Sequence, residues 1–84
     1  METVKVFDTW VEVPGKRLHF DVMTADEQTA IRLANEHVAA LGHPAVTVTP
    51  EECQFCHQEP LVMFPEEQQR AYRQDGGFIV SLSS

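Results

Sequence analysis

The most reactive side chains of this sequence are gathered in the stretch E-E-C-Q-F-C-H-Q, residues 51–58. Two thiols three positions apart can direct both sulfurs to one point, and the neighbouring imidazole can supply a third ligand. Cys53, Cys56 and His57 therefore predict a site for a transition metal, zinc in the first place. The sequence contains no second C-x-x-C pair and no H-x-x-H pair to complete four ligands. An open fourth position suits an exchangeable metal better than a sealed structural zinc.

Three other interpretations compete with a metal site. A thioredoxin-like redox pair needs its first cysteine at the start of a helix, and the prolines at 60 and 65 disfavour a long helix directly after the motif. A c-type haem attachment uses the same spacing, but a domain of 84 residues leaves little room for the macrocycle, so haem is disfavoured. The plainest alternative is that the two cysteines pack at a turn, since free cysteine is often buried.

A second polar set emerges if the Pro-Gly pair at 14–15 forms the corner of a β-hairpin. In the register centred on that corner, Asp8 opposes Asp21 and Trp10 opposes His19 on one face. Directly opposed carboxylates repel unless they are well solvated or share a cation or a proton. The simplest alternative is a solvated sheet face with one half-buried tryptophan, and a dimer interface over Trp10 is another.

Aspartate and histidine side chains in this arrangement can bind a metal or transfer protons. Asp8, His19 and Asp21 are therefore candidates for completing or flanking the cysteine site, and His43 is a further candidate ligand. The same three residues on the hairpin could serve as acid and base groups of an enzyme, which ranks behind the metal and interaction hypotheses.

Six segments have the composition or periodicity of regular secondary structure. Strands are predicted at 3–13, 16–23, 45–48 and 78–82, and helices at 24–41 and 65–75. Thr24 and Glu27 have the spacing of a capping box at the start of the first helix, and Gly42 with Pro44 predicts its end. A Gly-Gly pair at 76–77 predicts the end of the second helix.

The order β-β-α-β-α-β predicts a single α+β domain spanning residues 1–84. We expect two layers, with a mainly antiparallel four-stranded sheet and both helices on one face. The order of the strands within the sheet does not follow from the sequence.

Charge and hydropathy exclude several classes of partner. Thirteen acidic against six basic residues give a formal charge of −7, which repels nucleic acid and anionic membranes. No apolar run approaches the roughly 20 residues that a membrane-spanning helix needs. The N-terminal stretch also lacks the pattern of a signal peptide, so we expect a cytoplasmic protein whose cysteines stay reduced.

Several of these stretches together resemble a known family. V-F-D-T-W-V, L-H-F-D-V-M-T, V-T-V-T-P-E-E-C-Q-F-C-H and D-G-G-F-I-V follow one another as in the small bacterial proteins called domain of unknown function number twenty twenty-four. The resemblance runs from about Val4 to Val80 and implies a compact α+β domain, but no activity. The link Q-E-P-L-V-M-F-P-E-E departs from the shorter, more polar link of the family, so residues 61–64 are expected to cover the core edge or contact another chain.

Two functions follow as hypotheses from different classes. The first is a small cytoplasmic module that binds a transition metal such as zinc through Cys53, Cys56 and His57. The second is a module that binds another protein or forms a homodimer, in which the cysteine turn is purely structural.

Overall fold

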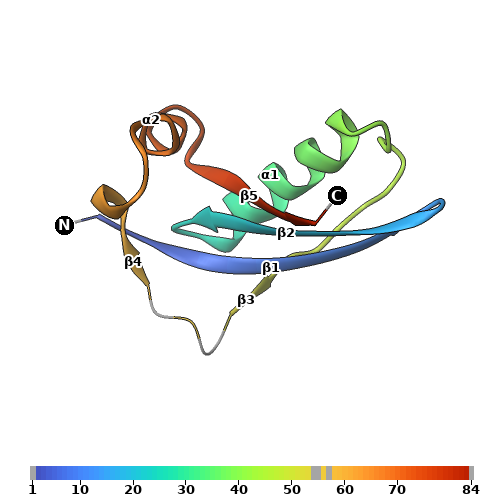
Figure 1. The fold of residues 1–84 in the computed structure, drawn as a ribbon, viewed down its shortest axis with the longest axis horizontal. Coiled ribbons are helices and arrows are strands. Elements are labelled where there is room, and N and C mark those ends of the chain that lie inside the picture. Colours follow the sequence, from blue (N-terminus) through green and yellow to red (C-terminus); the bar gives the residue numbers. More distant parts are fainter. Residues whose placement is uncertain (1, 54–55, 57, 84) are drawn as a thin grey trace.

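The computed structural model of the chain describes residues 2–53, 56 and 58–83. The elements are β1 (Thr3–Val13), β2 (Lys16–Thr24), α1 (Glu27–Ala40), β3 (Glu51–Glu52), β4 (Glu59–Pro60), the 3-10 turn η1 (Leu61–Met63), α2 (Glu66–Asp75) and β5 (Gly77–Ser83). The sheet has the strand order β3-β1-β2-β5, and β4 pairs with β1 as well (Figure 1). All these pairings are antiparallel, so the predicted α+β class and antiparallel sheet are confirmed.

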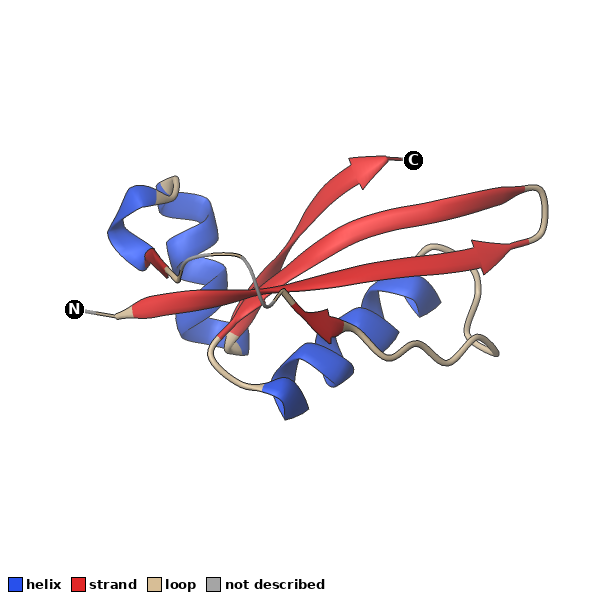
Figure 2. Cartoon of the chain, turned by 90° about the horizontal axis from the view of Figure 1, so that it is seen from below, coloured by secondary structure: helices blue, strands red, loops and turns tan. Residues whose placement is uncertain are grey.

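The long hairpin of β1 and β2 forms in the predicted register. Trp10 opposes His19 and Asp8 opposes Asp21, as the Pro-Gly corner indicated. Gly15 has a positive φ of 84°, which its missing Cβ permits at the turn. The strands fan out in Figure 2, because the sheet is strongly twisted.

The two helices cover opposite faces of the sheet, which corrects the prediction that both lie on one face. Alternate strand residues, among them Phe7, Phe20 and Val22, pack with the buried stripe of α1 in the larger core cluster. The residues between them form a second cluster, in which Val4 and Phe78 pack with η1 and α2. The sequence did not reveal this, because α2 buries none of its residues fully and carries only a weak apolar stripe.

The segment predicted as a strand at 45–48 forms no strand: Ala45 lies in a turn, residues 46–48 have no regular structure, and the third strand is the short β3 instead. Asn35 on α1 takes the place of a neighbouring strand. Its side chain accepts a hydrogen bond from the Val48 amide at 2.9 Å and donates to the Val48 carbonyl at 3.0 Å. A side-chain amide can satisfy both backbone groups of one residue, so Val48 stays buried without a ladder.

The start of α1 also differs from the prediction. The N-cap is Asp26, whose carboxylate accepts from the Thr29 amide at 2.8 Å. Thr24 is instead the last residue of β2, and its hydroxyl donates to the Gly76 carbonyl at 2.7 Å. The predicted capping box between Thr24 and Glu27 is therefore wrong, because β2 extends one residue further than the sequence pattern suggested and includes Thr24.

Asp26→Ala should measurably lower the free energy of unfolding, since the Thr29 amide at the helix start loses its acceptor. Glu27→Ala should change it by less than about 0.5 kcal/mol, because the structure gives Glu27 no capping role. Urea unfolding of both variants provides the measurement. A larger loss for Glu27→Ala than for Asp26→Ala would restore the capping box.

The end of α2 confirms the prediction from the Gly-Gly pair. Gly76 is the C-cap in the left-handed conformation, with φ of 87°, and its amide donates to the Tyr72 carbonyl at 2.8 Å.

Among the described residues, no helix is long and apolar enough to cross a membrane.

Candidate functional site

The half of the sheet face that α2 leaves open carries three ligand-type side chains. Asp8 comes from β1, and His19 and Asp21 come from β2. One ligand atom of each lies within 4.8 Å of the other two. The His19 Nε2 atom is 3.9 Å from Asp8 Oδ1. The hairpin register produces this cluster, because opposed and diagonal residues on one face of an antiparallel pair are neighbours.

The two carboxylates are a destabilised pair. The Asp21 Oδ1 atom is buried and has no hydrogen-bond partner among the described residues. A bond to Asp8 needs a shared proton, since two ionised carboxylates have no donor between them. Burial, followed by the interaction with Asp8, raises the pKa of Asp21 to about 7. The site therefore favours a positive charge, either a proton or a cation, between the two carboxylates.

Trp10 fixes the orientation of the histidine ring. Its indole stacks on the His19 imidazole with the ring centroids 3.6 Å apart and the planes within 9° of parallel. The Arg17 guanidinium lies 5.8 Å from the centre of the indole ring. Trp10 is nevertheless 60% exposed, so the indole covers the imidazole and remains accessible.

A cleft of about 260 Å³ adjoins this cluster. Asp8, Trp10, Thr49 and Glu51 line it. Asp8 belongs to both the cluster and the cleft, so the cluster can be reached from solvent on this side. Glu51 opposes Asp8 across the pairing of β3 with β1, which adds a third carboxylate at the rim.

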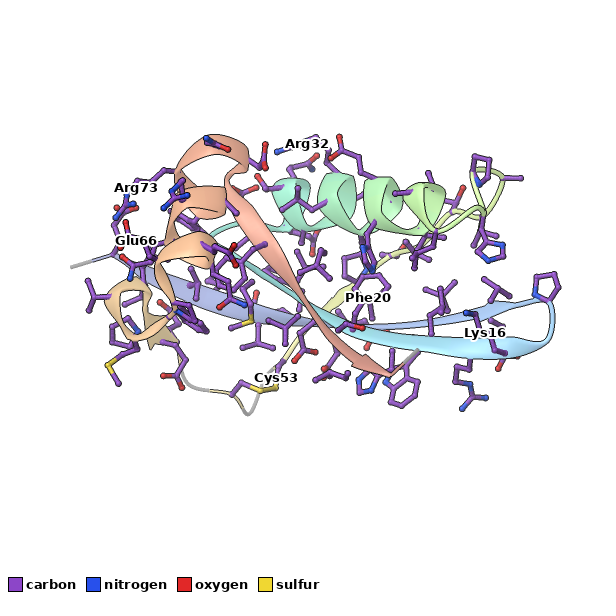
Figure 3. All side chains as sticks on the ribbon, turned by 45° about the horizontal axis from the view of Figure 1, so that its top comes forward. Lys16, Phe20, Arg32, Cys53, Glu66 and Arg73 are labelled. Carbon is purple, nitrogen blue, oxygen red and sulfur yellow. A yellow bond between two sulfur atoms is a disulfide. The ribbon has the colours of Figure 1, made fainter. Side chains whose placement is uncertain are left out.

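The cysteines lie elsewhere and in a different chemical state from the one predicted. Cys53 and Cys56 are joined in a disulfide, with their Cα atoms 5.4 Å apart. Figure 3 shows Cys53 beyond the sheet on the side away from α1. The expectation that both thiols stay free is wrong for this structure. A spacing of three lets the two sulfurs meet at one point, and that geometry serves a disulfide as well as a metal.

The structure does not bring the predicted ligands into one site. The Cys53 amide bonds to the Val6 carbonyl, whereas His19 opposes Trp10, four residues further along β1. Four residues of strand span roughly 13 Å, so Cys53 and His19 lie at separate places. His57 lies outside the described residues.

His43 lies apart from the cluster as well. It follows the C-terminal end of α1, where its amide donates to the Val38 carbonyl at 3.2 Å. Nothing in the sequence pattern connects Thr49 or Glu51 with Asp8, because only the position of β3 beside β1 brings them to the cleft. The pair of acids at 51–52 was the one feature of the sequence that could have indicated a further carboxylate at this site.

Two comparisons relate the chain to known proteins. A family model described as "Domain of unknown function (DUF2024)" matches residues 1–82. The chain belongs to this family. The resemblance inferred from the sequence is thus confirmed for the family, while the role of its cysteine motif stays a prediction.

A solved structure agrees with this family assignment. The chain is similar to the protein NE1680 from Nitrosomonas europaea, solved by NMR, with 37% identity and a TM-score of 0.72. The match covers 99% of this chain and 98% of that one. No curated protein matches the chain. The comparisons therefore support the fold of this DUF2024 member, and its function has to be argued from the site.

Proposed function

We propose that this DUF2024 member binds a divalent transition metal, such as zinc, through Asp8, His19 and Asp21 on the open sheet face. The observation that carries the proposal is the convergence of one ligand atom from each residue to within 4.8 Å. The metal function inferred from the sequence is retained, but its centre is placed on the hairpin rather than on the cysteines.

The donor set suits such an ion. One imidazole nitrogen and two carboxylates are ligands that Zn²⁺, Mn²⁺ and Fe²⁺ accept. A cation would satisfy the buried Asp21 Oδ1 atom, which has no hydrogen-bond partner in the part of the chain that the structure describes, and would cancel the repulsion between Asp8 and Asp21. The stacked indole of Trp10 holds the imidazole in place, as outer contacts commonly do for metal ligands.

Three protein ligands leave coordination positions open, and the adjoining cleft gives solvent and small molecules access to them. The bound ion would therefore be exchangeable and could act as a Lewis acid. The residues themselves would hold the ion, orient the imidazole and keep one carboxylate buried.

Metal binding can be followed through the fluorescence of Trp10, the only tryptophan in the chain and in contact with His19. We expect Co²⁺ or Ni²⁺ to quench tag-free oxidised protein saturably, and Zn²⁺ to compete. His19→Ala should weaken the affinity by at least about tenfold, because a ligand is lost. Isothermal titration with Zn²⁺ gives the same comparison without relying on the indole.

His43→Ala is the matched control, since it removes a histidine that lies apart from the cluster. It should leave the affinity unchanged. The double variant Cys53→Ser/Cys56→Ser, titrated under reducing conditions, separates the hairpin site from the cysteine motif. Loss of binding in that variant with full binding in His19→Ala would overturn the proposal and return the site to Cys53, Cys56 and His57.

The alternative of a protein-binding or homodimerising module stays a prediction. Trp10 at 60% exposure and Leu82 at 48% lie on the uncovered part of the sheet face and fit such a role. Acid and base catalysis by the hairpin cluster likewise stays a prediction.

A further inference from the structure

We propose that Cys53 and Cys56 form a reversible thiol–disulfide exchange site, reduced by a neutral or cationic dithiol and independent of the metal site. The motif therefore has a function other than the metal binding first inferred from it. The observations behind this are the disulfide itself, its accessibility, its place in the fold and the charges around it.

The two cysteines differ in exposure. Cys56 belongs to the exposed residues, whereas Cys53 is partly buried where it follows β3. An attacking thiol therefore reaches Cys56 first. Exposure of one sulfur beside a more protected partner is the arrangement that permits exchange, because the attacked sulfur must be accessible and its partner must leave.

The fold can accept both redox states. On one side of the disulfide, β3 pairs with β1 and the Cys53 amide donates to the Val6 carbonyl at 2.8 Å. On the other side, β4 pairs with β1 at Glu59 and Val4. The two ends of this excursion are thus fixed to one strand without the help of the sulfur–sulfur bond.

The bond also closes a short stretch of chain, with a sequence separation of only three. Neither core cluster contains a cysteine. A cross-link over so few residues restricts the unfolded chain far less than one between distant segments. Reduction should consequently change the local loop and leave the two cores intact.

The surrounding charge selects the partner. Glu51, Glu52 and Glu59 lie on the strands that flank the disulfide, and all three are exposed. Lys5 offsets one of them, with its Nζ atom 3.8 Å from Glu52 Oε1. The remaining negative charge repels anionic thiols and attracts cationic ones. A positively charged or neutral dithiol is therefore the chemical class that fits this site.

The exchange proceeds in two balanced steps. A thiolate of the dithiol attacks Cys56 Sγ, the sulfur–sulfur bond breaks, and its electron pair passes to the sulfur of Cys53, which takes up a proton. The second thiol of the partner then attacks the mixed disulfide, and Cys56 leaves as a thiol. The partner loses two electrons and two protons and becomes a disulfide, while the Cys53–Cys56 pair gains them.

Reduction can be followed by quenching oxidised full-length protein at intervals, alkylating the free thiols and counting the added groups by mass spectrometry. At low salt, cysteamine should react about tenfold faster per thiolate than 3-mercaptopropionate, and the ratio should fall towards one at high salt. Glu59→Gln should raise the rate with the anionic thiol several-fold and leave the rate with mercaptoethanol unchanged.

A second measurement separates exchange from a structural role. Dithiothreitol followed by re-oxidation should cycle both thiols completely, with an amide spectrum unchanged outside the segment 51–59. With Ellman's reagent, Cys53→Ser, which leaves Cys56, should react several-fold faster than Cys56→Ser. Unfolding on reduction, failure to re-form the bond or equal reactivity of the two variants would each refute the proposal. Zn²⁺ binding by the same samples reports on the hairpin site separately.

Discussion

Asp21→Asn should stabilise the metal-free protein at pH 8 and at the same time weaken its binding of Zn²⁺ by at least about tenfold. The substitution removes one of two facing carboxylates, so the repulsion from Asp8 disappears. The new amide can donate to Asp8, which an ionised aspartate cannot do. A gain in stability coupled to a loss of binding is the behaviour of a residue kept for its function.

The pH dependence of the wild-type protein follows from the same pair. The pKa of Asp21 is raised from 3.8 to about 7 by burial and by Asp8. The folded state thus binds this proton more tightly than the unfolded chain, so the stabilisation is complete below pH 3.8 and is lost as the pH rises through 7. The shift corresponds to about 4 kcal/mol at most, and solvent screening of this partly exposed group reduces it to about 1–2 kcal/mol.

The measurement is urea unfolding between pH 5 and pH 8 in the presence of a chelator. The free energy of unfolding of the wild-type protein should fall across this range relative to that of Asp21→Asn. His19 and Asp8 are the other ionisable side chains of the cluster. Saturating Zn²⁺ should restore the loss at pH 8, since an ion that binds the folded state stabilises it. Glu36→Gln, a charge change on α1, should alter stability by less than about 0.5 kcal/mol at every pH. Parallel wild-type and Asp21→Asn curves would show that Asp21 titrates normally.

The hairpin cluster was predictable from sequence because one strong local signal determined it. The Pro-Gly corner sets the register, and the register sets which side chains share a face. The sequence alone therefore groups Asp8, His19 and Asp21, and the observed register agrees. The burial of Asp21 was not predictable, because it depends on β5, which pairs Val80 against Asp21 from the far end of the chain.

The cysteine motif was less informative, for a chemical reason. The same spacing serves a metal, a redox pair or a packed turn, and the choice depends on what lies nearby in space. The structure places Cys53 beside Val6 and away from His19, which the order of elements alone could not show. The prediction that both helices lie on one face of the sheet was wrong for a similar reason. Helix α2 packs through partly buried residues such as Ala71 and Tyr72 rather than through a clear apolar stripe.

Gly77→Ala should lower the free energy of unfolding by about 3 kcal/mol, corresponding to a fall in melting temperature of roughly 10–20 °C for a domain of this size. A Cβ atom at this position would lie 2.6 Å from the Met23 carbonyl oxygen and 2.8 Å from both Leu33 Cδ1 and Thr24 Cβ. The Met23 carbonyl oxygen is a backbone atom of β2, and the Thr24 Cβ atom is bonded directly to that backbone. Neither can move aside without shifting β5 relative to β2. Thermal and urea unfolding of the metal-free protein would measure the loss.

Gly42→Ala is the matched control, because Gly42 has a positive φ of 101° but open space where a Cβ would lie. It should cost only about 1 kcal/mol, the strain of the left-handed conformation. Equal losses in the two variants would mean that close packing at Gly77 is unimportant.

The Gly-Gly pair at 76–77 predicted a single feature, the end of a helix. In the structure Gly76 supplies the left-handed cap, and Gly77 lets β5 approach β2 and α1 closely, in the pairing that sets Val80 opposite Asp21.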